Sequence, residues 1–193
     1  MESYLARDRA SRANDRDDDD LVSSAIGGDV EAYADLYERY LGRVYSYVYH
    51  RVGDGRLAED LTQRTFLKVW EGLPRFRVGA VPFRLWLYRA ARNLLIDHFR
   101  TRKPELLLTF DDSVIADPTP RPEDEVITRE QWERVRGAIA QLRPEHQEVL
   151  LLRFLDGLSH AEVGQVLGLR EPTVRVLQHR ALKCLLEILA HDG

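Results

Sequence analysis

Apolar residues recur every three or four positions along most of this sequence, which is the spacing of one face of an α-helix. The longest such run extends from about residue 30 to residue 51. No stretch shows the sustained alternation of apolar and polar residues that marks a half-buried strand. The sequence therefore predicts an all-α protein. The residues on the shared face of this run are Tyr33, Leu36, Tyr37, Tyr40, Val44, Tyr47 and Val48.

The tyrosines of this run admit two interpretations. They can form a surface on which nucleic-acid bases stack, or they can pack into a protein core. Because they share a helical face with leucine and valine, we favour the core. The run thus predicts a buried helix face and not a binding surface.

Glycine and proline divide the first half of the chain into three predicted helices, at about 30–51, 56–71 and 82–102. Pro82 suits the first turn of the third helix, because a proline there gives up no helical hydrogen bond. Pro104 stops that helix.

The second half of the chain predicts another helical domain, over residues 131–193. Its first two helices cover about 132–142 and 144–154. Ser159 and Glu162 form a capping box that begins a short helix, which ends at Gly168. A last long helix starts at Pro172 and runs to about residue 190.

Two acidic segments flank the first helical domain. Residues 1–20 carry 4 basic and 7 acidic groups and predict a disordered tail, in which Asp20 caps the following helix. Residues 105–130 carry 2 basic and 8 acidic groups, with three prolines in five residues, and predict an extended linker. Leu106-Leu107-Leu108 is too apolar for a linker that is exposed to solvent throughout, so we expect part of the linker to lie against a surface.

The charge distribution indicates a nucleic-acid partner although the whole chain has a net charge of −4. Residues 21–104 carry 14 basic and 9 acidic groups. Within them, residues 75–103 hold 8 basic groups and 1 acidic group, interleaved with aromatic residues. For Trp86 and Leu87 in this segment, a core position is at least as well supported as a DNA contact.

The capped short helix, the tight turn at Gly168 and the long last helix form a predicted helix-turn-helix, whose second helix fits a DNA major groove. An ordinary antiparallel helix pair is the alternative. Gly164 suits a close approach of the two helices. The outward residues are Arg175, Gln178, His179, Arg180 and Lys183, and the inward ones are Val174, Leu177, Ala181, Cys184 or Leu185, and Ile188.

The segment QLRPEHQEVLLLRFLDGLSHAEVGQVLGLREPTVRVLQHRALKCLLEIL resembles the promoter-binding region 4 of bacterial RNA polymerase sigma factors. It departs from that family at Arg170-Glu171-Pro172, where a serine cap and a glycine are frequent. From spacing, Arg175 is best placed to reach a base edge, while Arg180 and Lys183 lie nearer phosphates. The resemblance implies contacts with the minus-35 promoter element by Thr173, Arg175, Gln178, His179, Arg180 and Lys183.

The segment AEDLTQRTFLKVWE at 58–71 is similar to region 2.2 of the compact, extracytoplasmic-function (ECF) sigma factors. In that family this helix docks on the clamp coiled coil of the polymerase beta-prime subunit. The resemblance implies that Asp60, Gln63 and Leu67 contact core RNA polymerase. Arg64 departs from the usual glutamate of the family.

Residues 75–103 are similar to sigma regions 2.3 and 2.4, which open the minus-10 promoter element. By this resemblance the loop Arg77–Val81 holds a base flipped out of the duplex. The chain lacks the tandem tryptophan pair of the housekeeping factors, which predicts stricter promoter choice. The implied minus-10 contacts are Arg77, Arg84, Tyr88, Arg89, Arg92 and Asn93.

Taken together, the resemblance implies a two-domain ECF sigma factor that binds core RNA polymerase and promoter DNA, and whose linker threads through the polymerase. It also implies an anti-sigma factor as a partner. Two alternatives stay open: a helix-turn-helix regulator that does not join polymerase, and an adaptor that mimics a sigma factor.

An enzyme is the class least supported by this sequence. It contains no phosphate loop, no nucleophile with a base and no cluster of metal ligands, so we expect no catalytic residue, no metal and no cofactor. The six histidines are scattered, and the single cysteine, Cys184, lies on an inward helix face. No run of about 18 apolar residues and no signal-peptide core is present, so we expect a cytoplasmic protein without membrane insertion.

Overall fold

The computed structural model describes residues 17–101 and 129–191. Every regular element in this part of the chain is helical, which confirms the all-α prediction for it. The contacts divide the chain into two compact units, and the segment Ser46–Gly55 groups with the second unit. Most of the predicted tail (1–20) and of the predicted linker (105–130) lies outside the described residues, but residues 18–20 and 129–130 are helical and not extended chain.

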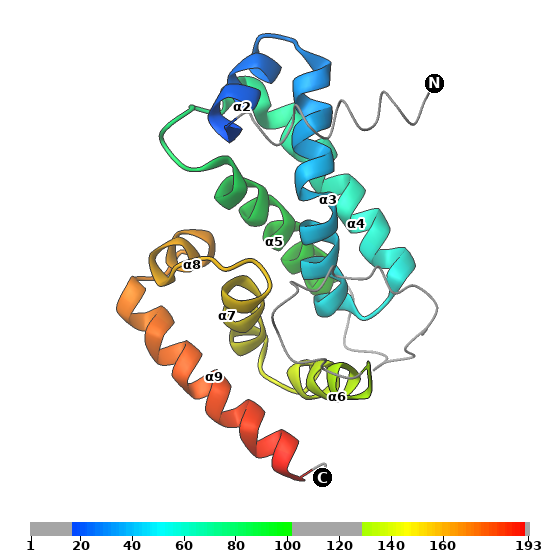
Figure 1. Ribbon diagram of the computed structural model, residues 1–193, viewed down its shortest axis with the longest axis vertical. Helices are drawn as coiled ribbons and strands as arrows, with labels where there is room; N and C mark the ends of the chain where they lie inside the picture. Colours follow the sequence, from blue (N-terminus) through cyan, green and yellow to red (C-terminus); the bar gives the residue numbers. More distant parts are fainter. Residues whose placement is uncertain (1–16, 102–128, 192–193) are drawn as a thin grey trace. The chain divides into compact units, whose positions relative to one another are not determined.

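The helices of the first unit follow the predicted boundaries closely (Figure 1). The three predicted helices begin and end within one residue of the structure's own limits. The structure adds a helix before them and a single 3-10 turn after the second. The elements are α2 (Asp18–Ile26), α3 (Val30–Val52), α4 (Gly55–Gly72), η1 (Leu73–Arg75) and α5 (Phe83–Thr101).

Aromatic packing joins α3 to its neighbours. Tyr37 and Phe66 of α4 have ring centroids 4.7 Å apart, and the Tyr33 hydroxyl donates to the Phe66 carbonyl at 2.5 Å. Tyr40 packs on Phe83 of α5 with centroids 5.8 Å apart. Tyr40 and Tyr47 are only 5% and 2% exposed, so these tyrosines belong to the core and do not form a stacking surface.

Helix α2 was not predicted as a separate element, and its start corrects the position expected for the cap. The N-cap is Asp17 and not Asp20, because the Asp17 carboxylate accepts the backbone N–H of Asp18 at 2.7 Å. Three aspartates then occupy the first turn, where the positive end of the helix dipole stabilises them. Leu21 and Val22 are fully buried.

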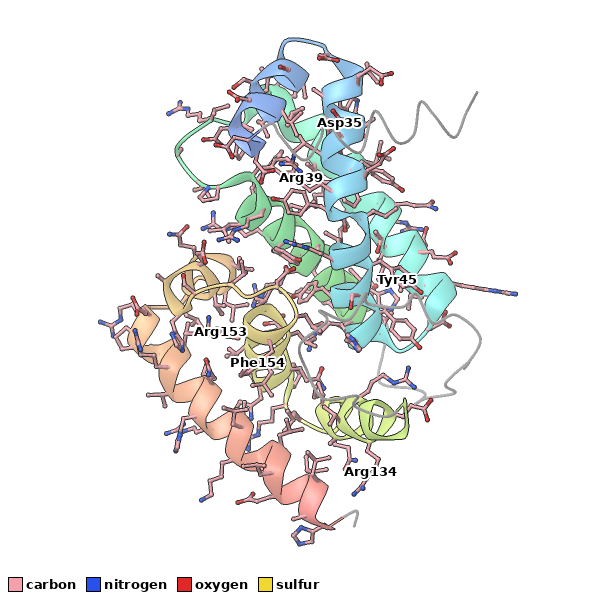
Figure 2. All side chains as sticks on the ribbon, viewed as in Figure 1. Asp35, Arg39, Tyr45, Arg134, Arg153 and Phe154 are labelled. Atoms are coloured by element: carbon pink, nitrogen blue, oxygen red, sulfur yellow. The ribbon has the colours of Figure 1, made fainter. Side chains whose placement is uncertain are left out.

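A charged contact fastens α2 to α3. Asp18 accepts a hydrogen bond at 2.5 Å from the guanidinium of Arg39, a side chain labelled on α3 in Figure 2, and another from the hydroxyl of Tyr40. Burial, together with the neighbouring Asp18, raises the pKa of the Tyr40 phenol, so this hydroxyl remains a donor. The acidic start of α2 therefore contributes to the tertiary structure of the first unit.

The second unit is built around its last helix. Figure 1 shows that α9 runs alongside α7 and that α8 lies near its N-terminal end; α6 also contacts it. The elements are α6 (Arg129–Ala140), α7 (Pro144–Phe154), α8 (His160–Leu167) and α9 (Glu171–His191). Fully buried apolar side chains from α7, α8, α9 and the α7–α8 turn form the core: Val149, Leu152, Leu158, Val163, Val174 and Ala181.

The part of the chain that the structure describes contains no helix long and apolar enough to cross a membrane.

Candidate nucleic-acid interface

The turn between α8 and α9 is fixed by local interactions that the sequence predicted. The Ser159 hydroxyl accepts the N–H of Glu162, and the Glu162 carboxylate accepts the N–H of Ser159 at 2.7 Å, which completes the capping box. Gly168 ends α8 with φ of 71°, a left-handed conformation that a glycine adopts at little cost.

Gly164 permits the tight approach between α8 and the residues that lead into α9. A Cβ atom at this position would lie 2.6 Å from the carbonyl oxygen of Leu169, closer than any real contact. The approach predicted for Gly164 is therefore confirmed, and its partner is backbone. Because backbone cannot move as a side chain does, the angle between the two helices depends on this glycine.

One face of α9 is buried and the opposite face is open. Val174 and Ala181 have no exposed surface, while Leu177 and Cys184 are half-buried, as the inward stripe predicted. The exposed residues along the first four turns are mostly polar or basic: Pro172, Thr173, Arg175, Val176, His179, Arg180 and Lys183. The structure thus brings five of the six predicted minus-35 residues onto one accessible face.

Gln178 is the sixth, and it is engaged within the protein. Its Oε1 accepts from Nε of Arg153 at 3.1 Å and lies 2.8 Å from Nε2 of His160. Arg153 also donates to the carbonyl oxygen of Leu158. These contacts join the ends of α7 and α8 to the middle of α9, so the side chain of Gln178 orients the outward face.

Arg175 is exposed but carries an intrahelical partner. Its guanidinium lies 2.5 Å from the carboxylate of Glu171, one turn earlier on α9. An exposed i,i+4 ion pair contributes little free energy, so a phosphate or a guanine can replace this carboxylate. Glu171 belongs to the Arg170–Pro172 segment that departs from the sigma-factor pattern, and it holds Arg175 close to the helix.

Helix α5 gives the predicted minus-10 residues different exposure. Asn93 is exposed, and Arg89 lies one turn earlier on the same helix face. Arg84, Arg89 and Arg92 are all half-buried. Tyr88 is only 1% exposed, which places its ring in the core and not on the DNA-facing surface predicted for it.

The loop before α5 is anchored by aromatic packing at both ends. Phe76 packs on Trp86 with centroids 4.7 Å apart and on Phe83 at 6.2 Å. Trp86 is half-buried and Leu87 fully buried, so both take structural positions. Between these anchors, Arg77 and the three residues after it are exposed, and Gly79 turns the chain with φ of 80°.

The predicted polymerase-binding face of α4 is also accessible. Gln63 is exposed, and Leu67 has 58% of its surface exposed although it is apolar. The carboxylate of Asp60 lies 3.0 Å from Nε of Arg64, the residue at which the chain departs from the family pattern. The departure therefore supplies Asp60 with a partner inside its own helix.

The supporting roles of Arg153 and His160 could not be predicted from the sequence. Arg153 ends a helix and His160 begins another, and nothing in their local pattern indicates a shared partner on a third helix. Val176 was not predicted as a site residue either, although a helical projection places it as an apolar residue on a polar face. Among the described residues no group of three His, Cys, Asp or Glu side chains could hold a metal ion.

Both halves of the chain are similar to known proteins. The family models described as Sigma-70 region 2 and Sigma-70, region 4 match residues 36–105 and 132–185. The ECF RNA polymerase sigma factor BldN of Streptomyces coelicolor is 38% identical over 175 residues, which are 90% of this chain and 66% of BldN. The ECF RNA polymerase sigma factor SigW of Bacillus subtilis is 31% identical over 82% of this chain and 89% of SigW. The structure of CnrH in complex with the cytosolic domain of CnrY has a TM-score of 0.72 at 25% identity, and covers 91% of this chain and 99% of CnrH.

Proposed function

Because the chain belongs to the extracytoplasmic-function family of RNA polymerase sigma factors, we propose that α9 reads the minus-35 promoter element and that α5, with the loop before it, binds the minus-10 element. The single observation that carries this assignment is the open, largely basic face of α9 on a rigidly capped helix-turn-helix. As a sigma factor the protein acts by binding and not by catalysis, in the cytoplasm with polymerase.

On α9 the proposed roles follow position along the helix. Thr173, Arg175 and His179 lie in the early turns and reach base edges, and a bidentate arginine–guanine contact discriminates by about 1–3 kcal/mol. Arg180 and Lys183 lie farther along and neutralise phosphates. Gln178 serves this face indirectly, because its Oε1 is held by Arg153 and His160.

On α5 the proposed role is promoter opening. The residues proposed for it are the exposed Asn93, the half-buried Arg84, Arg89 and Arg92, and Arg77 in the exposed loop. Flipping a base costs a few kcal/mol, so a melting protein needs a receptacle for the base besides positive charge. The loop from Arg77 to Val81, anchored by the aromatic cluster, is that receptacle in our proposal.

The proposed core-polymerase contact uses Asp60, Gln63 and Leu67 of α4, docked on the clamp coiled coil of the beta-prime subunit. An exposed leucine beside a carboxylate and an amide suits a partner helix that offers both apolar and basic side chains. The same exposed face makes an anti-sigma factor a fitting second partner, since covering it would block polymerase.

The decisive experiment adds the full chain to core polymerase and measures transcripts from a randomised promoter library. We expect promoter-specific initiation. The Arg180→Ala, Lys183→Ala variant should weaken binding to all promoters and lower the salt slope by about two units, one for each phosphate contact.

A second variant separates polymerase binding from DNA binding. Asp60→Ala with Gln63→Ala should reduce core association, measured without DNA, and leave helicity unchanged. A chain that binds DNA yet yields no promoter-specific transcripts with core polymerase would favour the alternative, a helix-turn-helix regulator that does not join polymerase.

A further inference from the structure

One apolar side chain lies in the middle of the largely polar and basic face that the first four turns of α9 expose. Val176 is 49% exposed, and its neighbours one turn away on the same face are Thr173, His179 and Arg180, all exposed. Val174, two residues earlier, is completely buried. The position of Val176 is therefore opposite the core and on the surface proposed to meet DNA.

Protein stability gives no reason for a valine at this position. A β-branched residue loses side-chain freedom in a helix and ranks below alanine, lysine or arginine in helix propensity. Half of its surface is open to water, so it gains little from burial. A surface that meets a ligand can supply the missing partner.

Two polar side chains in the early turns of α9 already have partners within the protein. The oxygen of Gln178 is taken by Arg153 and His160, and the guanidinium of Arg175 starts from an ion pair with Glu171. Val176 lies on the second turn, at a depth where recognition helices present side chains to base edges. It has no donor or acceptor, so it distinguishes bases only by contact with an apolar group.

The major-groove edge of DNA presents one such group, the 5-methyl of thymine. We propose that Val176 is a specificity-determining residue that packs on a thymine methyl in the minus-35 element. This inference rests on the proposed function, since it requires α9 in the major groove. A valine set against a guanine, cytosine or adenine edge would desolvate polar atoms without pairing them, which disfavours those bases at that step.

The test removes the methyl group and nothing else. After the preferred minus-35 sequence is selected from a random library, each thymine in it is replaced in turn by deoxyuracil. Affinity of the polymerase holoenzyme is then measured for every substituted promoter. We expect one position to lose about fourfold in affinity, the amount that one buried methyl group contributes.

The variants make the assignment specific. Val176→Ala should weaken binding to the thymine promoter and abolish the difference between thymine and uracil at that position, while Val176→Ile should retain it. Leu186→Ala is the matched control, because Leu186 is a 67% exposed apolar residue of α9 ten positions later. It should leave the uracil scan unchanged.

Three results would overturn the proposal. The selected element could lack a thymine on both strands, the uracil penalty could persist in Val176→Ala, or Val176→Ala could weaken core binding without DNA, which would make Val176 a protein contact. In each case the salt slope of Arg180→Ala with Lys183→Ala still reports on the groove assignment. A changed slope leaves the proposed function standing, and an unchanged slope overturns both.

Discussion

At the scale of single residues, the identity of a polar side chain does not reveal where its hydrogen bonds go. Gln178 and His179 are adjacent and both suited to reading bases, yet His179 is exposed while Gln178 accepts contacts from two other helices. Asp60 is likewise held by Arg64 within its own helix. Whether such a side chain is available to a ligand depends on partners that are distant in sequence, as for Gln178, or that depart from the family pattern, as for Asp60.

We predict that Gln178→Ala destabilises the second unit by about 1–3 kcal/mol, because it leaves partly buried donors of Arg153 and His160 without their acceptor. Thermal unfolding measures this loss. DNA binding should weaken evenly across promoters, while Gln178→Glu, which keeps an acceptor, should retain stability. An unchanged melting temperature combined with altered preference at one base pair would instead make Gln178 a base-reading residue.

At the scale of elements, the orientation of α9 depends on a contact between backbones. Gly164 lies where α8 meets the turn into α9, and its missing Cβ leaves space for the Leu169 carbonyl. A glycine within a helix normally costs about 1 kcal/mol relative to alanine. Glycine is nevertheless required at this position, because a side chain would clash with the turn and change the orientation of α9.

Gly164→Ala should therefore destabilise the second unit by about 1–3 kcal/mol, since the clash outweighs the gain in helix propensity. Gly137→Ala in α6 is the control: a Cβ there meets nothing within 4 Å, so stability should rise by up to about 1 kcal/mol. Chemical denaturation of both variants gives the comparison. If the two substitutions had the same sign, the turn would be less constrained than the geometry indicates.

At the scale of the whole molecule, each compact unit presents an exposed face of its own. The first carries the α4 and α5 faces, and the second carries the outward face of α9. In the proposed function these faces meet core polymerase and the two promoter elements. The grouping of Ser46–Gly55 with the second unit was not expected from the predicted boundaries.

We predict that the two domains remain folded when the chain is cut within residues 105–128. Each fragment should keep its helical circular dichroism and unfold with its own transition, because the acidic, proline-rich linker adds little core. Limited proteolysis followed by calorimetry provides the measurement. Loss of both transitions after the cut would show that the boundary is misplaced, with Ser46–Gly55 as the first segment to examine.

The sequence by itself determined most of the helices and the helix-turn-helix, although it missed α2 and the start of α6. Periodicity gave α3, α4, α5 and α9 nearly to the residue, and the capping box with its left-handed glycine gave α8. These features are local: a cap or a hydrophobic stripe involves residues within one or two turns of each other, so the chain alone specifies them.

Only the tertiary structure decided which surface residues are available and which are engaged. In it Tyr88 lies in the core, and Gln178 is bound to Arg153 and His160. Asp18 joins α2 to α3. Each outcome depends on contacts between residues of different helices, and a local sequence pattern does not predict such contacts. Helical spacing determines the direction in which a side chain points, whereas the packing of the helices determines its burial and its hydrogen-bond partners.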